Sequence, residues 1–379
     1  MTILDAATVF FLLPYILLIG ALTVGWHRAS RVRLGVKKTR GITRISVIIP
    51  FRNESAHVDR LLSALVCQNF PAERWEVIAV NDHSQDDTLE RLHRWQAHAG
   101  ISLRVLENTS GENGKKAALS RGIEQACGDL IVTTDADCQM GAGWLRQLSA
   151  YYEHHQPYLM FSPVLFEADH PEFFTRLQSL EAISLLATAA GSSQMQRPVF
   201  CNAANMAFPK DIYQQLKDPM LRHIASGDDT MLLLSIKKLD PSRIKFNPGA
   251  EAVVTTSPMD TVHEFWNQRK RWVSKSRHYR DPDILVAGAL VVLANLWLAL
   301  LAAGSLFSST FTTPLVAGFL VKMSADALLI WPTAAFFNRH HLMWSFLPGQ
   351  LLYPFYSTLS AIVGWTGGFT WKNRHYHVN

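Results

Sequence analysis

Residues 128–137 read Gly-Asp-Leu-Ile-Val-Thr-Thr-Asp-Ala-Asp, an apolar run that ends in two carboxylates one residue apart. The run predicts a buried strand. Residues i and i+2 of a strand point to the same side, so we expect Asp135 and Asp137 to be presented together. Facing carboxylates repel each other unless a cation or a proton lies between them. A divalent ion that also binds phosphate suits such a pair, which predicts a site for a metal-bound nucleotide. The alternative is a loop with two solvated acids.

Apolar strands alternate with helices before this stretch. Strands are expected at 46–50, 76–80 and 103–106. Helices are expected at 56–68, after a cap at Ser84, and at 115–126. Strands that are apolar throughout and alternate with helices indicate a parallel sheet covered on both faces. Such sheets bind ligands at the carboxyl ends of their strands. We therefore expect a Rossmann-like α/β fold with a mostly parallel sheet.

Polar residues collect at those expected strand ends and in the loop at 111–116, which supplies amide, carboxylate and ammonium groups. Each residue alone is equally explained by a turn or a helix cap. Several on one rim predict a nucleotide pocket. The candidates are Pro50, Asn53, Glu54, Asp82, Lys115, Asp135 and Asp137.

A second lobe is expected from 157 to about 257. It begins with a helix at 172–190 and includes a strand-like segment at 200–208 that carries two amides. Ser226-Gly227-Asp228-Asp229-Thr230 then precedes an apolar helix at 231–236. Acids at a helix start are explained either as capping groups that favour the helix dipole or as functional carboxylates.

Residues 260–280 predict one basic helix. Gln268, Arg271 and Trp272 are spaced i, i+3, i+4 and share a face. Arg269 and Lys270 add to the basic charge, which suits an amphipathic helix at an anionic membrane surface. A second interpretation is that the shared face meets a ligand, since guanidinium forms paired hydrogen bonds with a diphosphate. The two interpretations are compatible.

Long apolar segments flank these regions. Residues 9–26 carry no charge and are followed by a basic stretch at 27–40, which predicts a retained membrane anchor with its basic side in the cytoplasm. Further apolar segments lie at 284–306, at 313–337, where Lys322 and Asp326 are placed to pair, and at 342–364, where Pro348 and Pro354 are expected to break the helix. Three full C-terminal spans would place the basic tail outside, so we expect one segment to be re-entrant or interfacial.

The bulk numbers agree with a membrane protein that does not bind nucleic acid. The chain has 379 residues and a formal charge of +5, and much of the basic excess lies beside apolar segments. Its 4 cysteines show no CxxC spacing, which excludes a zinc knuckle or redox pair of that type. The expected division is an anchor at 1–27, a cytoplasmic domain at 43–257, an interfacial helix at 258–281, membrane or re-entrant segments at 284–366 and a basic tail at 367–379.

Six motifs in this order resemble family 2 inverting glycosyltransferases. The motifs are residues 46–53, Asn81-Asp82, Gly114-Lys115, Asp135-Ala136-Asp137 (DxD), Gly227-Asp228-Asp229 and Gln268-Arg269-Lys270-Arg271-Trp272 (QxxRW). The resemblance covers roughly residues 43–280. It is strongest to membrane-bound members such as cellulose, hyaluronan and poly-N-acetylglucosamine synthases and ceramide glucosyltransferase. It implies the A-type glycosyltransferase fold, with transmembrane helices at both ends.

The resemblance also implies roles. Asp82 would bind the nucleotide base, in a pocket lined by Pro50, Asn53 and Glu54, and Lys115 would lie near the base and ribose or the phosphates. Asp135 would contact ribose or metal, and Asp137 would bind Mg²⁺ or Mn²⁺ with the donor diphosphate. Asp229 would be the general base. Asp228 is its rival because the chain has Gly-Asp-Asp where the family has Thr-Glu-Asp. Gln268, Arg271 and Trp272 would close on the diphosphate and frame the acceptor.

The expected function is transfer of a sugar from a nucleoside-diphosphate sugar, a UDP-sugar above all, to a lipid hydroxyl at a bacterial inner membrane. A processive polysaccharide synthase with a growing glycan as acceptor is the main alternative. A nucleotidyltransferase and an inactive partner subunit are further alternatives. The sequence does not determine the sugar, the acceptor or the oligomeric state.

Overall fold

The computed structural model describes residues 2–32, 42–98, 100–108, 114–168, 172–220, 227–366, 369–371 and 374–376. They form two compact units. The helical unit comprises Met1–Arg28, Asp169–Met195 and Met259–Asn379, and the α/β unit comprises Ala29–Ala168 and Gln196–Pro258. Parts of the sequence predictions lie outside the described residues: the basic residues 33–40, loop residues 111–113, Ser226, and tail residues 367–368, 372–373 and 377–379.

A seven-stranded sheet of order β3-β2-β1-β4-β8-β6-β9 forms the centre of the α/β unit as described. Strands β1 to β4 are mutually parallel, whereas β8 runs antiparallel to both β4 and β6. The sheet is therefore mostly parallel, as expected. The strands are β1 (Ile45–Phe51), β2 (Trp75–Asn81), β3 (Leu103–Glu107), β4 (Leu130–Thr133), β6 (Leu159–Phe161), β8 (Met206–Pro209) and β9 (Ile244–Phe246).

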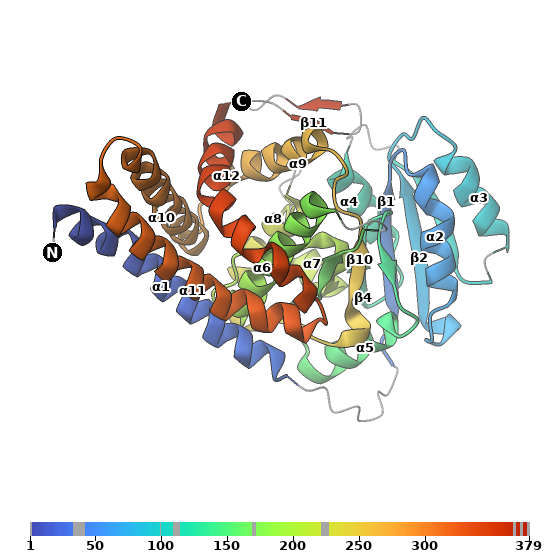
Figure 1. Ribbon diagram of the computed structural model, residues 1–379. Coiled ribbons are helices and arrows are strands. Elements are labelled where there is room, and N and C mark those ends of the chain that lie inside the picture. The colour runs from blue at the N-terminus through green and yellow to red at the C-terminus, as the bar shows by residue number, and fades with distance from the viewer. Residues whose placement is uncertain are drawn as a thin grey trace. The chain divides into compact units, whose positions relative to one another are not determined.

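Helices cover both faces of this sheet, which explains why β1, β2 and β4 each carry a run of buried apolar residues. Val47 and Ile49 of β1 pack into one core with α2 (Ser55–Val66), α3 (Thr88–His98) and α5 (Trp144–His155). Figure 1 shows α2 and α3 along one side of β2. On the opposite face, Ile48 meets α4 (Lys115–Gln125) at Gly122, where an added Cβ would lie 2.4 Å from the Ile48 side chain. The predicted strands and helices of this region are confirmed.

Shorter elements complete the α/β unit. Strands β5 (Gln139–Met140), β10 (Val254–Thr256) and β7 (Val164–Phe166) form a small mixed sheet. Helix α7 (Lys210–Gln215) follows β8, and α8 (Asp228–Lys237) precedes β9. The predicted cap at Ser84 is wrong, because α3 begins at Thr88. Ser84 instead accepts a hydrogen bond from the Asn53 N–H at 3.1 Å.

The helical unit contains α1 (Ile3–Ser30), α6 (Phe173–Gln194), α9 (Val262–Ser274), α10 (Pro282–Ser305), α11 (Thr312–Phe336) and α12 (Phe346–Thr366). Among the described residues, three helices are long and apolar enough to cross a membrane: Ile3–Ser30, Pro282–Ser305 and Ser309–Phe336. A small hairpin of β11 (Phe369–Trp371) and β12 (Arg374–Tyr376) follows α12. The predicted helix at 260–280 is shorter than expected, since α9 passes into a 3₁₀ turn at Lys275–His278.

Proline does not break α12. The helix runs from Phe346 to Thr366 with Pro354 inside it. Pro348 lies in the first turn, where the missing N–H has no helical acceptor to lose. The expected break at these prolines is therefore wrong.

Candidate active site

Lys115 joins two acidic segments of the α/β unit. It is the first residue of α4, after Gly114, whose φ of 111° is accessible to glycine. The Lys115 Nζ lies 2.7 Å from Asp135 Oδ1 and 3.4 Å from Asp228 Oδ2. Burial lowers the pKa of Lys115, but the carboxylates of Asp135 and Asp228 raise it more, so its pKa lies above the ordinary value. The lysine is therefore a fixed positive charge that contacts both Asp135 and Asp228, two acids that are 93 positions apart in the sequence (228 − 135 = 93).

Asp135 and Asp137 lie in a turn and not in the strand itself. Strand β4 ends at Thr133, and the Cys138 N–H donates to the Asp135 carbonyl at 3.2 Å. Burial nonetheless alternates here, with both acids partly exposed and Ala136 and Cys138 buried. The two carboxylates are thus both accessible, although the strand geometry predicted for them is wrong.

Each carboxylate of this turn has a partner in the α/β unit. Asp135 pairs with Lys115, and Asp137 Oδ2 accepts a hydrogen bond from Thr256 Oγ1 at 3.0 Å. Burial, and then the charges of Asp137 and Asp135, raise the pKa of the neighbouring Cys138 thiol well above its ordinary value. The two acids of the turn are therefore held by two different segments, Asp135 by α4 and Asp137 by β10.

Asp228 and Asp229 begin α8, after Gly227 at φ 85°. Asp228 is 9% exposed, and its Oδ2 has no hydrogen-bond donor among the described residues, although the oxygen pairs electrostatically with Lys115. Asp229 is more exposed, and its Oδ1 accepts from the Thr230 N–H at 2.6 Å and the Thr230 hydroxyl at 3.1 Å. The structure thus brings Asp228 to the same lysine as Asp135.

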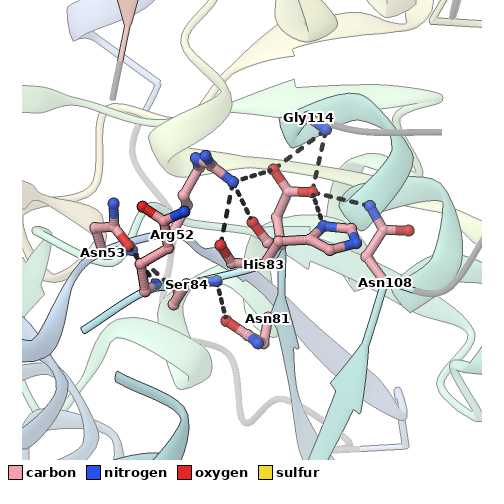
Figure 2. A network of polar contacts seen from close by, with 9 residues as sticks. Arg52, Asn53, Asn81, His83, Ser84, Asn108 and Gly114 are labelled. Carbon is pink, nitrogen blue, oxygen red and sulfur yellow. Dashed lines mark hydrogen bonds and ion pairs between the residues drawn. The ribbon is translucent and has the colours of Figure 1, made fainter. Parts of the chain in front are cut away.

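Asp82 lies at the centre of a polar network at the ends of β1, β2 and β3. Figure 2 shows Arg52, Asn108 and Gly114, three of its partners. The Gly114 N–H donates to both Asp82 carboxylate oxygens at 3.1 Å, and Asn108 Nδ2 donates to Oδ1 at 3.0 Å. Arg52 donates to the Asp82 carbonyl at 2.7 Å, and its Nη1 lies 4.0 Å from Oδ2. Asp82 is 2% exposed. Its carboxylate therefore fixes the residue that precedes Lys115.

Asn53 and Glu54 fix the turn after β1. Asn53 has a φ of 51°, which asparagine tolerates better than most residues, and its Oδ1 accepts from the Gln85 N–H at 2.8 Å. The Glu54 N–H donates to Thr88 Oγ1 at 2.8 Å, and Glu54 Oε2 lies 2.8 Å from His57 Nδ1. Pro50 is part of β1, opposite Val80. These predicted rim residues thus lie together at the carboxyl ends of β1 and β2.

Gln268, Arg271 and Trp272 belong to α9 of the helical unit. All three are partly exposed. Arg269, which was expected to add surface charge, is instead 4% exposed and pairs with Glu181. The expectation that Arg269 belongs to a basic surface is therefore wrong, because its guanidinium is paired inside the unit.

The acidic turn suits a divalent ion that shares its ligands with a phosphate. The described residues contain no group of three or more His, Cys, Asp or Glu side chains placed to hold a metal ion by themselves. Mg²⁺ and Mn²⁺ are commonly held by one or two carboxylates plus substrate phosphates. The buried, undonated Oδ2 of Asp228 shows that the cluster has acceptor capacity beyond Lys115. Asp135 and Asp137 are two carboxylates of the kind that such an ion shares with a phosphate.

The structure adds residues that the sequence reasoning did not select. Arg52 and Asn108 follow β1 and β3, so the rule that polar groups gather at strand ends would have found both. Thr256 lies in β10, and no spacing relates it to Asp137. Glu181 is the single acid within α6, and a lone acid on an apolar helix is a signal for a buried partner.

The parallel β3-β2-β1-β4 order, followed by an antiparallel β8 and an acidic turn after β4, is the A-type glycosyltransferase fold, a Rossmann-like α/β arrangement. Residues 46–216 match the family described as glycosyl transferase family 2. The likeness to this family thus spans residues 46–216 of the chain.

The chain is similar to two proteins that are named as transferases. The chain is 28% identical to the glycosyltransferase AglE of Haloferax volcanii over 192 residues, 49% of this chain and 58% of that protein. It is 39% identical over 101 residues to an undecaprenyl-phosphate 4-deoxy-4-formamido-L-arabinose transferase of Aeromonas hydrophila, 26% of this chain and 30% of that protein. The chain thus covers 58% of the length of the first relative and 30% of the length of the second.

The mannosyltransferase PcManGT from Pyrobaculum calidifontis, solved in complex with GDP-Man and Mn²⁺, shares the fold. The superposition has a TM-score of 0.57 at 20% identity and covers 92% of this chain and 99% of that one.

Proposed function

We propose that this protein is a membrane-bound, inverting glycosyltransferase that moves a sugar from a nucleoside-diphosphate sugar, preferably a UDP-sugar, to a hydroxyl of a lipid. The observation that carries the proposal is the meeting of Asp135 and Asp228 at Lys115. It joins the acidic turn, where a donor would be held, to the helix start that supplies a base. A nucleotide-binding sheet alone would not need the second element.

Donor binding is assigned to the rim of the sheet. Pro50, Asn53 and Glu54 would line the nucleotide pocket. Asp82 would either contact the nucleotide base or position Gly114, whose N–H donates to its carboxylate. Asp135 and Asp137 would hold Mg²⁺ or Mn²⁺. Such an ion, when bound, neutralises charge on the departing diphosphate. Lys115, which remains protonated, adds a fixed positive charge beside Asp135.

The proton chemistry is assigned to the start of α8. A carboxylate within hydrogen-bond reach of the acceptor hydroxyl takes its proton as the oxygen attacks the anomeric carbon. One direct displacement inverts that carbon and requires no second catalytic carboxylate, in contrast to glycoside hydrolysis. Asp228 is nearly buried and paired with Lys115, whereas Asp229 is the more exposed acid. We therefore assign the base to Asp229.

Gln268, Arg271 and Trp272 are assigned to the same reaction on the strength of their motif. The Arg271 guanidinium would stabilise the negative charge that develops on the leaving diphosphate, because charge stabilisation in the transition state lowers the barrier. Gln268 and Trp272 would frame the acceptor. Their spacing presents an amide, a guanidinium and an indole on one face of α9.

A membrane lipid is the proposed acceptor because three helices of the described chain could span a bilayer. Two relatives carry names that specify polyprenyl-phosphate lipids, a dodecaprenyl-phosphate galacturonate synthase and the undecaprenyl-phosphate transferase described above. We place the protein in a bacterial inner membrane, with the α/β unit on the cytoplasmic side, where the basic residues after α1 would remain.

Replacing each acid of α8 tests the assignment. Asp229→Asn is expected to abolish transfer of labelled sugar by membranes that support it with the wild type, while donor binding measured by titration survives. Asp228→Asn is the matched control at the neighbouring position. It is expected to retain part of the turnover, because its role is to pair with Lys115. Full turnover by Asp229→Asn would disprove the choice of base.

A further inference from the structure

Arg269 occupies the buried stripe of α9. Phe265 and Arg269, one helical turn apart, are 9% and 4% exposed, whereas the neighbouring Lys270 and Arg271 are partly exposed. The helix starts at a capping box, in which Thr261 and Glu264 exchange hydrogen bonds. Both its start and its buried face are therefore fixed within the helical unit.

Two other helices of the helical unit hold the Arg269 guanidinium. Its Nε donates to Tyr356 Oη of α12 at 2.7 Å, and its Nη2 donates to Glu181 Oε2 of α6. Tyr356 Oη in turn donates to Glu181 Oε1 at 3.2 Å. These contacts form a closed triangle, so the buried charge is compensated and its direction is set. A planar guanidinium can satisfy several acceptors at fixed angles, which a lysine ammonium cannot.

The same guanidinium orients two motif residues. Its Nη1 donates to Gln268 Oε1. Its carbon lies 4.2 Å from the centre of the Trp272 ring and 4.3 Å from that of Phe265, so the group contacts two aromatic rings. Because arginine only donates, the Gln268 carbonyl faces Arg269, and its NH₂ group is the part left to donate to a ligand. An NH₂ donor suits an oxygen of a diphosphate or sugar.

We propose that Arg269 is a positioning residue: held by Glu181 and Tyr356, it sets the Gln268 amide as a donor and fixes the plane of the Trp272 indole for the transfer step. The inference rests on the proposed function. It goes beyond that function in assigning a role to Arg269, Glu181 and Tyr356. Misplacing groups that act in the transition state lowers kcat more than it weakens ground-state binding.

Tyr356→Phe gives the mildest test, since it keeps the ring that packs on Phe265 and Trp266 and removes only the hydroxyl. We expect kcat to fall roughly 10- to 100-fold, with the dissociation constant of the donor unchanged. Arg269→Lys is also expected to lower kcat and leave the dissociation constant of the donor unchanged, although it keeps the positive charge. In a Trp272→Ala background, the additional effect of Tyr356→Phe on kcat should shrink, because the two changes act through one group.

Normalising kcat to the number of donor-binding sites separates positioning from a purely structural role. Glu251→Gln, which breaks the exposed pair of Glu251 with Arg146 at 2.8 Å in the α/β unit, is the matched control and should leave kcat unchanged. If kcat per donor site is unchanged in Tyr356→Phe and Arg269→Lys while the wild type transfers sugar, the inference is overturned. If the wild type transfers no sugar at all, the proposed function itself fails.

Discussion

Buried carboxylates of the α/β unit differ in the number of protein hydrogen-bond donors around them, and this difference indicates their roles. Asp82 is enclosed by protein donors, whereas the Oδ2 of Asp228 has none among the described residues. A buried carboxylate surrounded by donors supports its neighbours, and one that faces mainly a cation, as Asp228 faces Lys115, holds that cation in place. On this basis Asp82 contributes to the fold of the rim as well as to any contact with a nucleotide.

Removing the Asp82 carboxylate should destabilise the rim. Asp82→Ala removes the acceptor of the Gly114 N–H, removes one hydrogen bond of the Asn108 amide and deprives Arg52 of a nearby negative charge. Leaving a buried donor without a partner costs about 1–3 kcal/mol. A lower melting temperature of the purified protein in detergent is expected, and Asp129→Ala, an exposed acid on the same unit, is the control. An unchanged melting temperature would show that the network contributes nothing to stability.

Asp86 gives a pH-dependent test. It accepts hydrogen bonds from Thr88 Oγ1 at 2.6 Å and from the Ser55 N–H at 3.0 Å. Burial raises the pKa of the Asp86 carboxyl, but the hydrogen bonds from Thr88 and Ser55 lower it more, from 3.8 to about 2. A depressed pKa stabilises the folded state above the unfolded pKa, and this stability is lost as pH falls through the folded pKa.

We therefore expect Asp86→Asn to lower the melting temperature at neutral pH, with a difference from wild type that narrows as pH falls from 3.8 to about 2. The side chain is exposed, so screening limits the effect to less than ~1 kcal/mol. Asp87→Asn, at the exposed neighbouring position, is the control. A difference that is constant with pH would show that the charge of Asp86 does not stabilise the fold.

At the scale of elements, glycine sets the approach of α1 to α6. A Cβ added at Gly25 of α1 would lie 2.3 Å from the Gly191 carbonyl oxygen of α6. One added at Gly191 would lie 2.5 Å from the Leu22 carbonyl oxygen. Backbone atoms cannot move aside as flexible side chains do. Small residues are the usual means by which membrane helices pack this closely.

Gly25→Ala should therefore separate the two helices. An overpacked contact costs about 1–3 kcal/mol, and we expect the melting temperature in detergent to fall accordingly. Gly20→Ala on the same helix is the matched control, since nothing lies within 4 Å of its added Cβ. Equal melting temperatures for the two variants would contradict the close packing of α1 on α6.

Across the whole molecule, the features that could be predicted from the sequence are those that depend on local patterns of apolar and polar residues. Strands β1 and β2 were predictable because every position is buried or nearly so, and each strand carries an apolar run, at 47–51 and 77–80. The rim candidates followed from the rule that parallel strands end at one edge. The helices that could span a membrane were predictable from length and apolar composition alone. The pairing of Lys322 with Asp326 was predictable from their spacing, and a 2.7 Å contact confirms it.

Other features depend on tertiary partners, which local spacing does not reveal. Arg269 resembles its basic neighbours in sequence, and its burial is set by Glu181, 88 positions away. The helix at 173–194 groups with the apolar helices and not with the sheet, because a broad apolar face does not specify its partner. Pro354 was expected to end a helix that continues through it.

A buried polar cluster should couple the helices of the helical unit. Lys322 Nζ of α11 lies 2.7 Å from Asp326 Oδ2 and 3.0 Å from Gln350 Oε1 of α12, and Tyr15 Oη of α1 donates to Asp326 at 2.6 Å. Lys322 is 1% exposed. Charges inside apolar helices are costly unless paired, so the cluster fixes three helices in register.

Asp326→Leu alone should strongly reduce the yield of folded protein and its melting temperature. Breaking one partner of a buried pair costs about 3–5 kcal/mol, because the remaining charge is uncompensated. Replacing both, as Lys322→Met with Asp326→Leu, should recover much of the loss. A double variant no more stable than the single one would contradict the charge-pair account.

The most direct test of the central claim is donor turnover by the purified protein in vesicles of bacterial lipid. A panel of labelled nucleoside-diphosphate sugars would be offered with Mg²⁺ or Mn²⁺, and the products would be separated into lipid, polymer and released phosphates. We expect label in the lipid fraction, one nucleoside diphosphate released per sugar transferred, and loss of both with Asp229→Asn. Label in polymer would indicate a processive synthase, and pyrophosphate a nucleotidyltransferase. No turnover of any donor would contradict the claim.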